Sequence, residues 1–500
     1  MQIGRLWKGW ARGILLSAVL GLPVIAGAAP ATVRFTAPTV RLDIARTGGL
    51  PVGWLHCRPA CDAPEAVVQS LIDGSGNGRF AWAGDDAGVV AAMTDAVYVV
   101  DEDGPDIELR STTDIAGRER VHRYHWDADR QVLQLTLDLP DGIGLRVGTG
   151  PAFVPESLPG FGAVYTDVRA VIVDDDGQRW IGEPDQPSAG PESLPADSWA
   201  GIRTQFWAIL LHPDTRTRLI RELPEANQPQ LAFDFSAQSP VMIELAAGPV
   251  EYRVLKRIDP KLTGMLFAAL WDWLRALCFG MLWLLESLHA LVGNEGLAIM
   301  LLSLSVKILM VPLTRIADRW QQDVNRIQAR LQPALAEIKA KYKGEDAHNR
   351  VLAVYREHGV HPLFTLKSLA GFLIQIPVFI AAFDMLGGNF ALYQAPFLWI
   401  DDLSKPDRFA ALPFELPFFG GWLNLLPFLM TGLTLLASAL QAEPALTESL
   451  RRQQRLRLYG MAAVFFVLFY TFPAGMVLYW MTNNLLHLLK ILPQAIRERS

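Results

Sequence analysis

The sequence contains few cysteines and few charged residues, and these shortages exclude several classes of protein. Three cysteines in 500 residues cannot form a disulfide-dense scaffold, and no cysteine or histidine spacing matches a metal site. No phosphate-binding glycine loop and no nucleophile with a neighbouring base stands out, so neither an enzyme nor a cofactor is predicted. The net charge of −6 argues against a general polyanion binder, and no specific nucleic-acid recognition is expected.

Apolar residues are abundant and are gathered in the second half of the chain. Hydrophobic residues make up 51% of the sequence and charged residues only 19%, against about 25% charged in soluble domains. Several runs approach the ~20 apolar residues that cross a hydrocarbon core. These runs predict a polytopic α-helical membrane protein with five spans, near residues 297–314, 366–386, 418–440, 458–472 and 474–490. The last two spans come from one uncharged run that Pro473 divides into a tight helical hairpin.

The first half of the chain has the pattern of an exported all-β domain. Residues 1–28 combine a basic start, an apolar stretch and an Ala-rich end, which predicts a signal peptide or a retained signal anchor. Residues 29–258 show period-two alternation, which predicts β-strands. Cys57 and Cys61 lie in this domain, where they either pair as a disulfide or stay two small buried side chains.

Residues 259–295 predict an amphipathic helix that lies in the outer membrane interface. The polar residues of this segment fall on one helical stripe, which favours an interfacial position over a span; they are Asp272, Arg275, Glu286 and His289. Lys and Arg are concentrated in the segment 315–362 and in the tail 493–500. The positive-inside rule places both of these segments in the cytoplasm.

Lys307 is the most informative residue, because it lies near the middle of the first predicted span. A central lysine costs about 2.5–3.5 kcal/mol on insertion scales. It either snorkels to a boundary about eight residues or ~12 Å away, or faces a hydrated cavity among the helices. A cavity would be lined by polar groups of several spans, and the candidates are Ser303, Gln375, Thr431, Tyr479 and Asn483.

The segment 315–362 predicts a hairpin of two amphipathic helices that is broken near Gly344. The segment is mildly basic, so it is either a solvated hairpin that touches anionic lipid or a mobile docking arm. The candidate docking residues are Arg326, Arg330, Lys339, Lys341 and Lys343.

Six motifs in the second half carry a resemblance to a known family. They are VPLT at 311–314, LQP at 331–333, VHPL at 360–363, LIQIP at 373–377, APFLWIDDLS at 395–404 and FPAGMVLYW at 472–480. In this order they resemble the bacterial members of the YidC/Oxa/Alb family of membrane protein insertases. The resemblance implies a β-supersandwich for the exported domain. It also implies a membrane core over residues 296–492 with a hydrophilic groove, in which Lys307 is the groove cation.

What the resemblance implies about function is insertion and folding of inner-membrane proteins, alone or with the Sec translocase. The implied partners are nascent membrane proteins, the lipid bilayer, the Sec translocase and the ribosome. The implied location is the inner membrane, with the large domain in the periplasm and the C-terminus in the cytoplasm.

The chain departs from the family pattern at three points. Lys307 stands where the family usually has an arginine, the signal region looks cleavable, and the pair Cys57 and Cys61 is not typical. These departures leave open a housekeeping insertase and a paralogue with a narrower clientele. Two other functions also stay open. They are a channel or transporter that binds an anion at Lys307, and an exported ligand-binding sandwich that the helices merely anchor.

Overall fold

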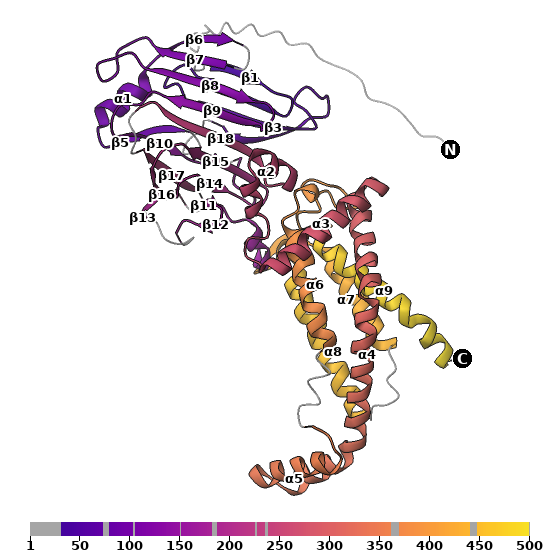
Figure 1. Ribbon diagram of the computed structural model, residues 1–500. Helices are drawn as coiled ribbons and strands as arrows, with labels where there is room; N and C mark the ends of the chain where they lie inside the picture. Colours follow the sequence, from indigo (N-terminus) through magenta and orange to yellow (C-terminus); the bar gives the residue numbers. More distant parts are fainter. Residues whose placement is uncertain are drawn as a thin grey trace, which may run out of the picture.

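The structure is a computed structural model that describes residues 32–73, 80–103, 106–150, 152–182, 188–225, 228–235, 239–361, 370–440 and 448–499. The predicted signal segment 1–28 lies outside these residues. The molecule is elongated, with a β domain at one end and a set of helices that extends away from it (Figure 1). This division agrees with the predicted order of an all-β half followed by a helical half.

Three sheets build the β domain, and every strand pair within them is antiparallel. The four-stranded sheet contains β1 (Thr32–Thr36), β2 (Val40–Ala45), β3 (Pro51–Arg58) and β4 (Val67–Ile72) in that order. The five-stranded sheet has the order β13 (Ser188–Ser193), β16 (Thr217–Glu225), β17 (Gln228–Phe235), β10 (Ile143–Val147) and β5 (Ala81–Gly84). The nine-stranded sheet has the order β12 (Gly177–Trp180), β11 (Arg169–Asp174), β14 (Trp199–Arg203), β15 (Trp207–Pro213), β18 (Val241–Pro249), β9 (Val132–Leu137), β8 (Val121–Asp127), β7 (Asp106–Ser111) and β6 (Tyr98–Asp103).

The alternation seen in the sequence becomes the buried face of these sheets. Leu133, Leu135 and Leu137 of β9 are buried, whereas Gln134 and Thr136 between them are partly exposed. Side chains of successive strand residues point to opposite faces, so the buried set packs into one core. This core joins all three sheets and confirms the predicted β-sandwich domain.

Two short helices, α1 (Ala87–Asp95) and η1 (Gly160–Tyr165), lie between strands of the β domain. Two others, α2 (Tyr252–Ile258) and η2 (Pro260–Met265), lead from β18 to the helical half. The helical half contains α3 (Asp272–Val292), α4 (Glu295–Lys341), α5 (Gly344–Glu357), α6 (Ala370–Gly387), η4 (Phe390–Leu392), α7 (Leu425–Leu440), α8 (Glu448–Phe469) and α9 (Ala474–Arg499). A hairpin of β19 (Ala410–Leu416) and β20 (Gly420–Leu423) precedes α7.

Several helix boundaries differ from the expected ones. α4 runs without a break from the first predicted span into the hairpin segment, because Pro312 and Pro333 lie inside it without ending it. The helix ends before Gly344 as expected. α8 begins at Glu448, ten residues or nearly three turns before the predicted span, and α9 continues through Pro493 into the predicted tail 493–500.

α7 begins at Leu425, although the apolar run that predicted it begins near 418. The reason is the carboxylate of Asp407, whose Oδ2 accepts the backbone N–H groups of Leu425 at 2.7 Å and Leu426 at 3.0 Å. These are N–H groups that a helix start leaves without an intrahelical partner. The apolar residues before Leu425 form β20 instead of a further turn of helix.

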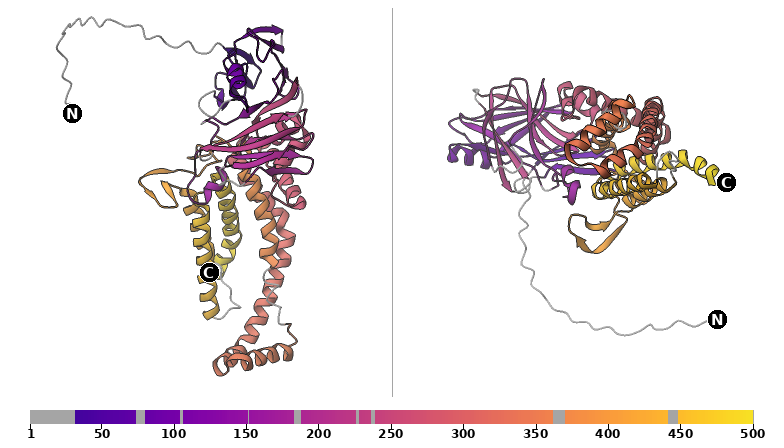
Figure 2. Two further views of the ribbon diagram at one scale, coloured as in Figure 1. Left: turned by 90° about the vertical axis from the view of Figure 1, so that its left-hand side faces the viewer. Right: turned by 90° about the horizontal axis from the view of Figure 1, so that it is seen from below.

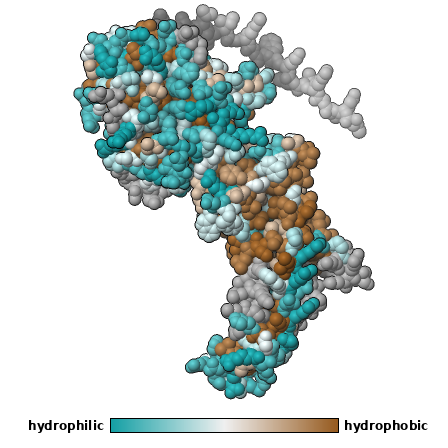
Figure 3. All heavy atoms as spheres, in the orientation of Figure 1, coloured by the Kyte–Doolittle hydropathy of each residue, from teal (hydrophilic) through white to brown (hydrophobic). Residues whose placement is uncertain are grey.

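Among the described residues, two helices are long and apolar enough to cross a membrane, namely α3 and the Glu295–Ile338 part of α4. Shorter apolar segments occupy Leu373–Gly387 and Leu425–Leu440. Five spans therefore stay a prediction, as does the interfacial position of residues 259–295. Figure 1 shows α3 running obliquely to α4, and Figure 3 shows apolar side chains gathered over the helices next to the β domain.

The polar stripe predicted on α3 contacts the end of the β domain. The Arg275 guanidinium donates to the backbone oxygens of Leu266 at 3.1 Å and Thr263 at 2.9 Å. Glu286 forms an ion pair with Arg253 of α2 at 2.8 Å. These contacts tie α3 to the segment that leaves the sandwich.

Aromatic contacts join the β domain to the ends of the helices. The ring of Tyr165 in η1 lies 5.8 Å from that of Phe472 and 6.3 Å from that of Phe383. The Arg58 guanidinium lies 4.7 Å over the ring of Phe390. The β domain therefore sits directly on the helical half without a free linker between them.

The buried imidazole of His122 predicts how pH acts on the β domain. The Asp138 backbone N–H donates to Nδ1 at 3.2 Å, Nε2 lies 3.0 Å from the Tyr98 hydroxyl, and burial lowers the pKa of His122 from 6.5 to about 4. The unfolded chain takes up the proton near pH 6.5, so stability present above pH 6.5 is lost as the pH falls toward 4. By linkage this amounts to ~3 kcal/mol from His122 at pH 4.

We expect the variant His122→Gln, which keeps a hydrogen-bond acceptor, to show a weaker dependence of the free energy of unfolding on pH between pH 6.5 and 4. Burial also lowers the pKa of His56 to about 4, so roughly half of the dependence should persist. Denaturant unfolding of the purified full chain at several pH values measures this. If the free energy of unfolding of the variant changes with pH as steeply as that of the wild type, His122 does not cause this pH dependence.

Candidate functional site

α9 is the helix around which the polar residues of the helical half are arranged. It packs against α4, α6 and α7, and Figure 1 and Figure 2 both show these helices side by side. Its first turns are buried and largely apolar, from Ala474 to Tyr479. Polar residues follow on the next two turns, at Thr482, Asn483, Asn484 and His487.

Lys307 of α4 points to this polar part of α9. Its Nζ donates a hydrogen bond to the backbone oxygen of Asn483 at 2.8 Å. The side chain is half-buried, because it lies at the edge between the buried residues Ser303 and Val306 and the exposed residue Ile308. Lys307 therefore borders the helix interface and does not extend toward the end of α4.

The ammonium group of Lys307 is only partly satisfied. It carries three N–H donors, and the described residues supply one hydrogen bond to it. The remaining donors need water or another acceptor, since an uncompensated charge among apolar side chains is unfavourable. This geometry favours the hydrated-cavity interpretation over snorkelling.

Three of the other predicted groove residues carry buried hydroxyls with no partner in the described part of the chain. These are Ser303 of α4, Thr431 of α7 and Tyr479 of α9, although the Tyr479 hydroxyl lies near the Asn483 side chain. Buried hydroxyls are normally hydrogen-bonded, and water is the usual partner where protein groups are lacking. They therefore add to the polar character of the surfaces between α9 and its neighbours.

A second polar contact joins α9 to α7. The Asn484 Nδ2 donates to the Thr434 hydroxyl at 2.8 Å and to the Met430 backbone oxygen at 3.3 Å. The sequence reasoning missed Asn484 and Thr434. The signal that could have found them is helical spacing, since Thr434 lies three residues after Thr431 and Asn484 lies three residues before His487.

Gln375 of α6 is half-buried, and no hydrogen bond brings it to Lys307 or Asn483. α6 does pack against both α4 and α9. Gln375 thus belongs to a neighbouring helix of the same set, whereas Lys307 and Asn483 are joined directly by a hydrogen bond between α4 and α9.

The end of the helix set near the β domain is closed by apolar packing. Leu392 and Leu403 from the segment before β19 are buried against α9, and the Gly475 N–H donates to the Leu403 backbone oxygen at 2.9 Å. Gly296 faces Phe397 so closely that a Cβ would meet the ring at 2.1 Å. Lys307 lies eleven residues further along α4, about 16 Å from Gly296.

The predicted docking residues lie on the far part of α4 and at the start of α5. Arg326, Arg330 and Lys343 are exposed, and Lys341 forms an ion pair with Glu337 at 2.6 Å. The side chain of Lys339 lies outside the described residues. Cys57 and Cys61 are disulfide-bonded in the β domain, at the end of β3, and take no part in the groove.

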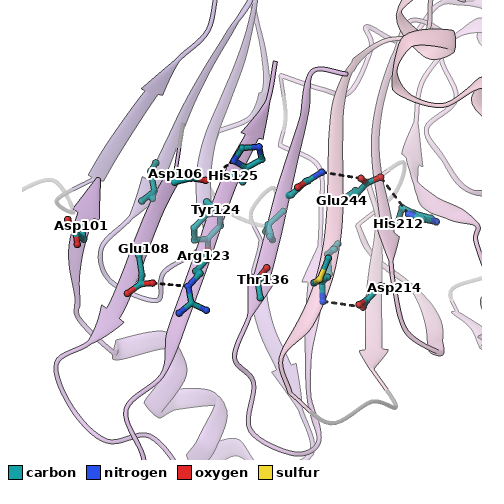
Figure 4. A pocket seen from close by; sticks show the side chains of 15 residues that line it. Asp101, Asp106, Glu108, Arg123, Tyr124, His125, Thr136, His212, Asp214 and Glu244 are labelled. Atoms are coloured by element: carbon teal, nitrogen blue, oxygen red, sulfur yellow. Dashed lines mark hydrogen bonds and ion pairs between the residues drawn. The ribbon is translucent and has the colours of Figure 1, made fainter. Parts of the chain in front are cut away.

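A cavity of about 580 Å³ lies on the nine-stranded sheet, away from the helices (Figure 4). Its carboxylates largely have partners: Glu108 pairs with Arg123 at 2.8 Å, and the hydrogen bond with His212 lowers the pKa of Glu244 to about 2. Within the described residues no group of three or more His, Cys, Asp or Glu could hold a metal ion.

Comparisons with known proteins relate this chain to one family. Residues 287–496 match the model of the 60Kd inner membrane protein family. A membrane protein insertase YidC of Syntrophobacter fumaroxidans is 34% identical over 409 residues, which cover 77% of this chain and 70% of the relative. A YidC of Polynucleobacter asymbioticus is 29% identical over 67% of this chain and 57% of its own length. A crystal structure of an active YidC insertase with its first transmembrane domain resolved covers 92% of both chains, with a TM-score of 0.36 and 17% identity.

The matched region and the fold together define an inner-membrane protein with an N-terminal β-sandwich domain and a helical half. At this level of identity and coverage, the chain belongs to the YidC family of membrane protein insertases.

The buried hydroxyls generate a prediction about water. Cysteine at Ser303 or Thr431 should react with a small water-soluble thiol reagent in the folded protein, because both hydroxyls lack protein partners. Cys278 is buried in α3, where its thiol contacts the Ala381 backbone oxygen, so it serves as the matched unreactive cysteine. Mass-spectrometric labelling rates measure the difference, and rates equal to that of Cys278 would contradict a hydrated groove.

Proposed function

We propose that the chain inserts and folds inner-membrane proteins through a hydrated groove beside α9, with Lys307 as the groove cation. The observation that carries this proposal is the half-buried ammonium of Lys307, which has one hydrogen bond to Asn483 and donors left for another acceptor. A polar or acidic segment of an incoming protein can supply that acceptor. Family membership favours insertion over a channel, a transporter or an anchored ligand-binding sandwich.

The physical role of the groove is to lower the free energy of moving a polar tail partway through the bilayer. A carboxylate near Lys307 replaces part of its hydration by an ion pair, which is stronger among apolar helices than in water. The hydrophobic segment of the client can meanwhile slide past the exposed side of α4, where Ile308 and Leu309 face outward. No nucleotide is needed for this exchange.

The proposed orientation places the β domain in the periplasm and α5 and the C-terminus in the cytoplasm. It is supported by the basic residues of the far part of α4 and of the end of α9. In this orientation the apolar closure near the β domain lies on the periplasmic side. The groove is then entered from the cytoplasm and from lipid.

Short helices support a locally thin bilayer around the groove. α7 has 16 residues and reaches about 24 Å, less than the ~30 Å of a typical hydrocarbon core. Hydrophobic mismatch of this kind thins the surrounding lipid. A thinner bilayer shortens the distance that the polar tail of a client must travel.

We further propose that the exposed basic residues of the arm, Arg326, Arg330 and Lys343, dock anionic partners. The ribosome and anionic lipid carry the negative charge that these residues attract, and the Sec translocase is a further partner that the family resemblance implies. Lys341 contributes less, because Glu337 already pairs with it.

Replacement of Lys307 tests the groove. In proteoliposomes that contain the purified chain, Lys307→Leu should slow insertion of a single-span client with an acidic exported tail by about tenfold or more, the factor that ~1.4 kcal/mol provides. Lys307→Arg should insert at least as well as the wild type, because arginine keeps its charge when desolvated. Protease protection of the client tail measures insertion.

Two controls make the result specific. A client whose acidic residues are replaced by Asn and Gln should lose most of its dependence on Lys307. The double variant Lys307→Leu, Leu309→Lys keeps the charge of α4 but moves it to the exposed face, so it should behave like Lys307→Leu. Full insertion by Lys307→Leu at equal membrane abundance would rule out the proposed role.

A further inference from the structure

The β19–β20 hairpin exposes large apolar side chains. Phe409, Phe414, Leu416, Phe418 and Trp422 of this segment are each 38–59% exposed. Phe161 and Val164 of η1 in the β domain are exposed as well, and the Phe161 ring lies 5.0 Å from that of Phe418, edge to face. Two segments far apart in the sequence thus form one surface. We call it the outer patch; its members are Phe161, Val164, Phe409, Phe414, Leu416, Phe418 and Trp422.

The outer patch is held in place by polar contacts at its base. Arg408 forms an ion pair with Glu156 of the β domain at 2.7 Å, and its guanidinium lies over the Trp422 ring at 5.6 Å. The Tyr470 hydroxyl donates to the Trp422 backbone oxygen at 3.0 Å. These contacts fix the hairpin to both the β domain and the loop between α8 and α9. The orientation of its exposed face is therefore determined by the fold.

The composition of the outer patch is unsuited to water. Residues 409–429 carry a single charge, at Glu415. A contiguous exposed apolar surface generally marks a contact with a membrane or a partner, and a two-stranded hairpin alone is marginally stable in water. Phe and Trp side chains are typical of segments that lie at the boundary between lipid headgroups and acyl chains.

The position of the hairpin favours lipid as the occupant. Figure 2 shows it projecting sideways at the level of the helix ends nearest the β domain, away from the other helices. α7 follows it directly, and Phe428 and Leu429 in the first turns of α7 are also exposed. The outer patch is therefore continuous with the side of α7 that faces outward.

We propose that the outer patch lies in the lipid leaflet on the side of the β domain, with its rings at the boundary between headgroups and acyl chains. This lipid contact holds the β domain at a fixed height above the membrane through η1 and the Glu156–Arg408 pair. The inference rests on the proposed spanning of the helices, and it is independent of the role of Lys307 in insertion.

An environment-sensitive fluorophore on single introduced cysteines tests the proposal in the full chain. Phe414→Cys and Val164→Cys report on the two halves of the outer patch. Val464→Cys on α8 is the lipid-facing control, and Val99→Cys on β6 is the water-facing control, since both residues are exposed. Cys57 and Cys61 are paired and Cys278 is buried, so the introduced thiol takes the label.

The labelled proteins are reconstituted into phosphatidylethanolamine–phosphatidylglycerol vesicles and quenched by iodide or by lipids with a nitroxide near the headgroup. At Phe414 and Val164 we expect iodide quenching at least about fivefold weaker than at Val99 and clear quenching by the shallow nitroxide. Iodide access equal to that at Val99 would overturn the proposal. Protection from both quenchers would also overturn it, in favour of a protein contact.

The control on α8 separates this proposal from the proposed function. If the label at Val464 is quenched by lipid and the label at Phe414 is not, only the outer patch is wrong. If Val464 itself is open to iodide, α8 does not face lipid, and the membrane arrangement behind the proposed function fails as well.

Discussion

The arrangement of the helical half depends on one constraint, the placement of a lysine halfway along an apolar helix. Among the described residues, Lys307 has one protein acceptor, the backbone oxygen of Asn483, for three donors. Closer packing of α4 on α9 would bury the charge without compensation. This cost is the reason for our proposal that this part of the interface holds water or a polar ligand. The polar turns of α9 lie where this constraint applies, whereas its first turns, which face the apolar closure, are close-packed.

The β domain contributes to the groove by closing one end of the helix set. Tyr165 in η1 packs against Phe383 and Phe472, at the ends of α6 and of the loop before α9. Gln205 donates to the backbone oxygen of Gly387, the last residue of α6. Because these contacts involve both α6 and the loop before α9, the β domain holds the ends of several helices together.

Much of this fold is predictable from the sequence, because local patterns determine it. The alternation of apolar and polar residues in β9 predicted which of its side chains face the core. Gly344 and Pro473 each separate two helices. The start of α7 is not predictable in this way, since the capping carboxylate of Asp407 lies 18 residues before Leu425. The continuity of α4 was also missed, because a change from apolar to basic composition does not by itself end a helix.

The candidate site was predictable only in part. Lys307 stands out because a charge in an apolar run is rare, and Asn483 follows from its place on the polar face of the last helix. The direct contact between them could not be foreseen, because it depends on how α4 and α9 cross. Asn484 and Thr434 were missed for the same reason, since their hydrogen bond exists only once α9 packs on α7.

The short α7 and the outer patch together indicate how the protein is seated in lipid. A 16-residue helix leaves several ångströms of a typical hydrocarbon core unmatched. The apolar hairpin that precedes this helix offers lipid contact beyond its first turn, where a helix end would otherwise meet headgroups. In the proposed arrangement, the chain contacts lipid on the side of the β domain through the β19–β20 hairpin, which projects sideways, and not through further turns of helix. In the proposed arrangement, the lipid would then thin on the opposite side of the membrane, toward Lys307 and the polar turns of α9.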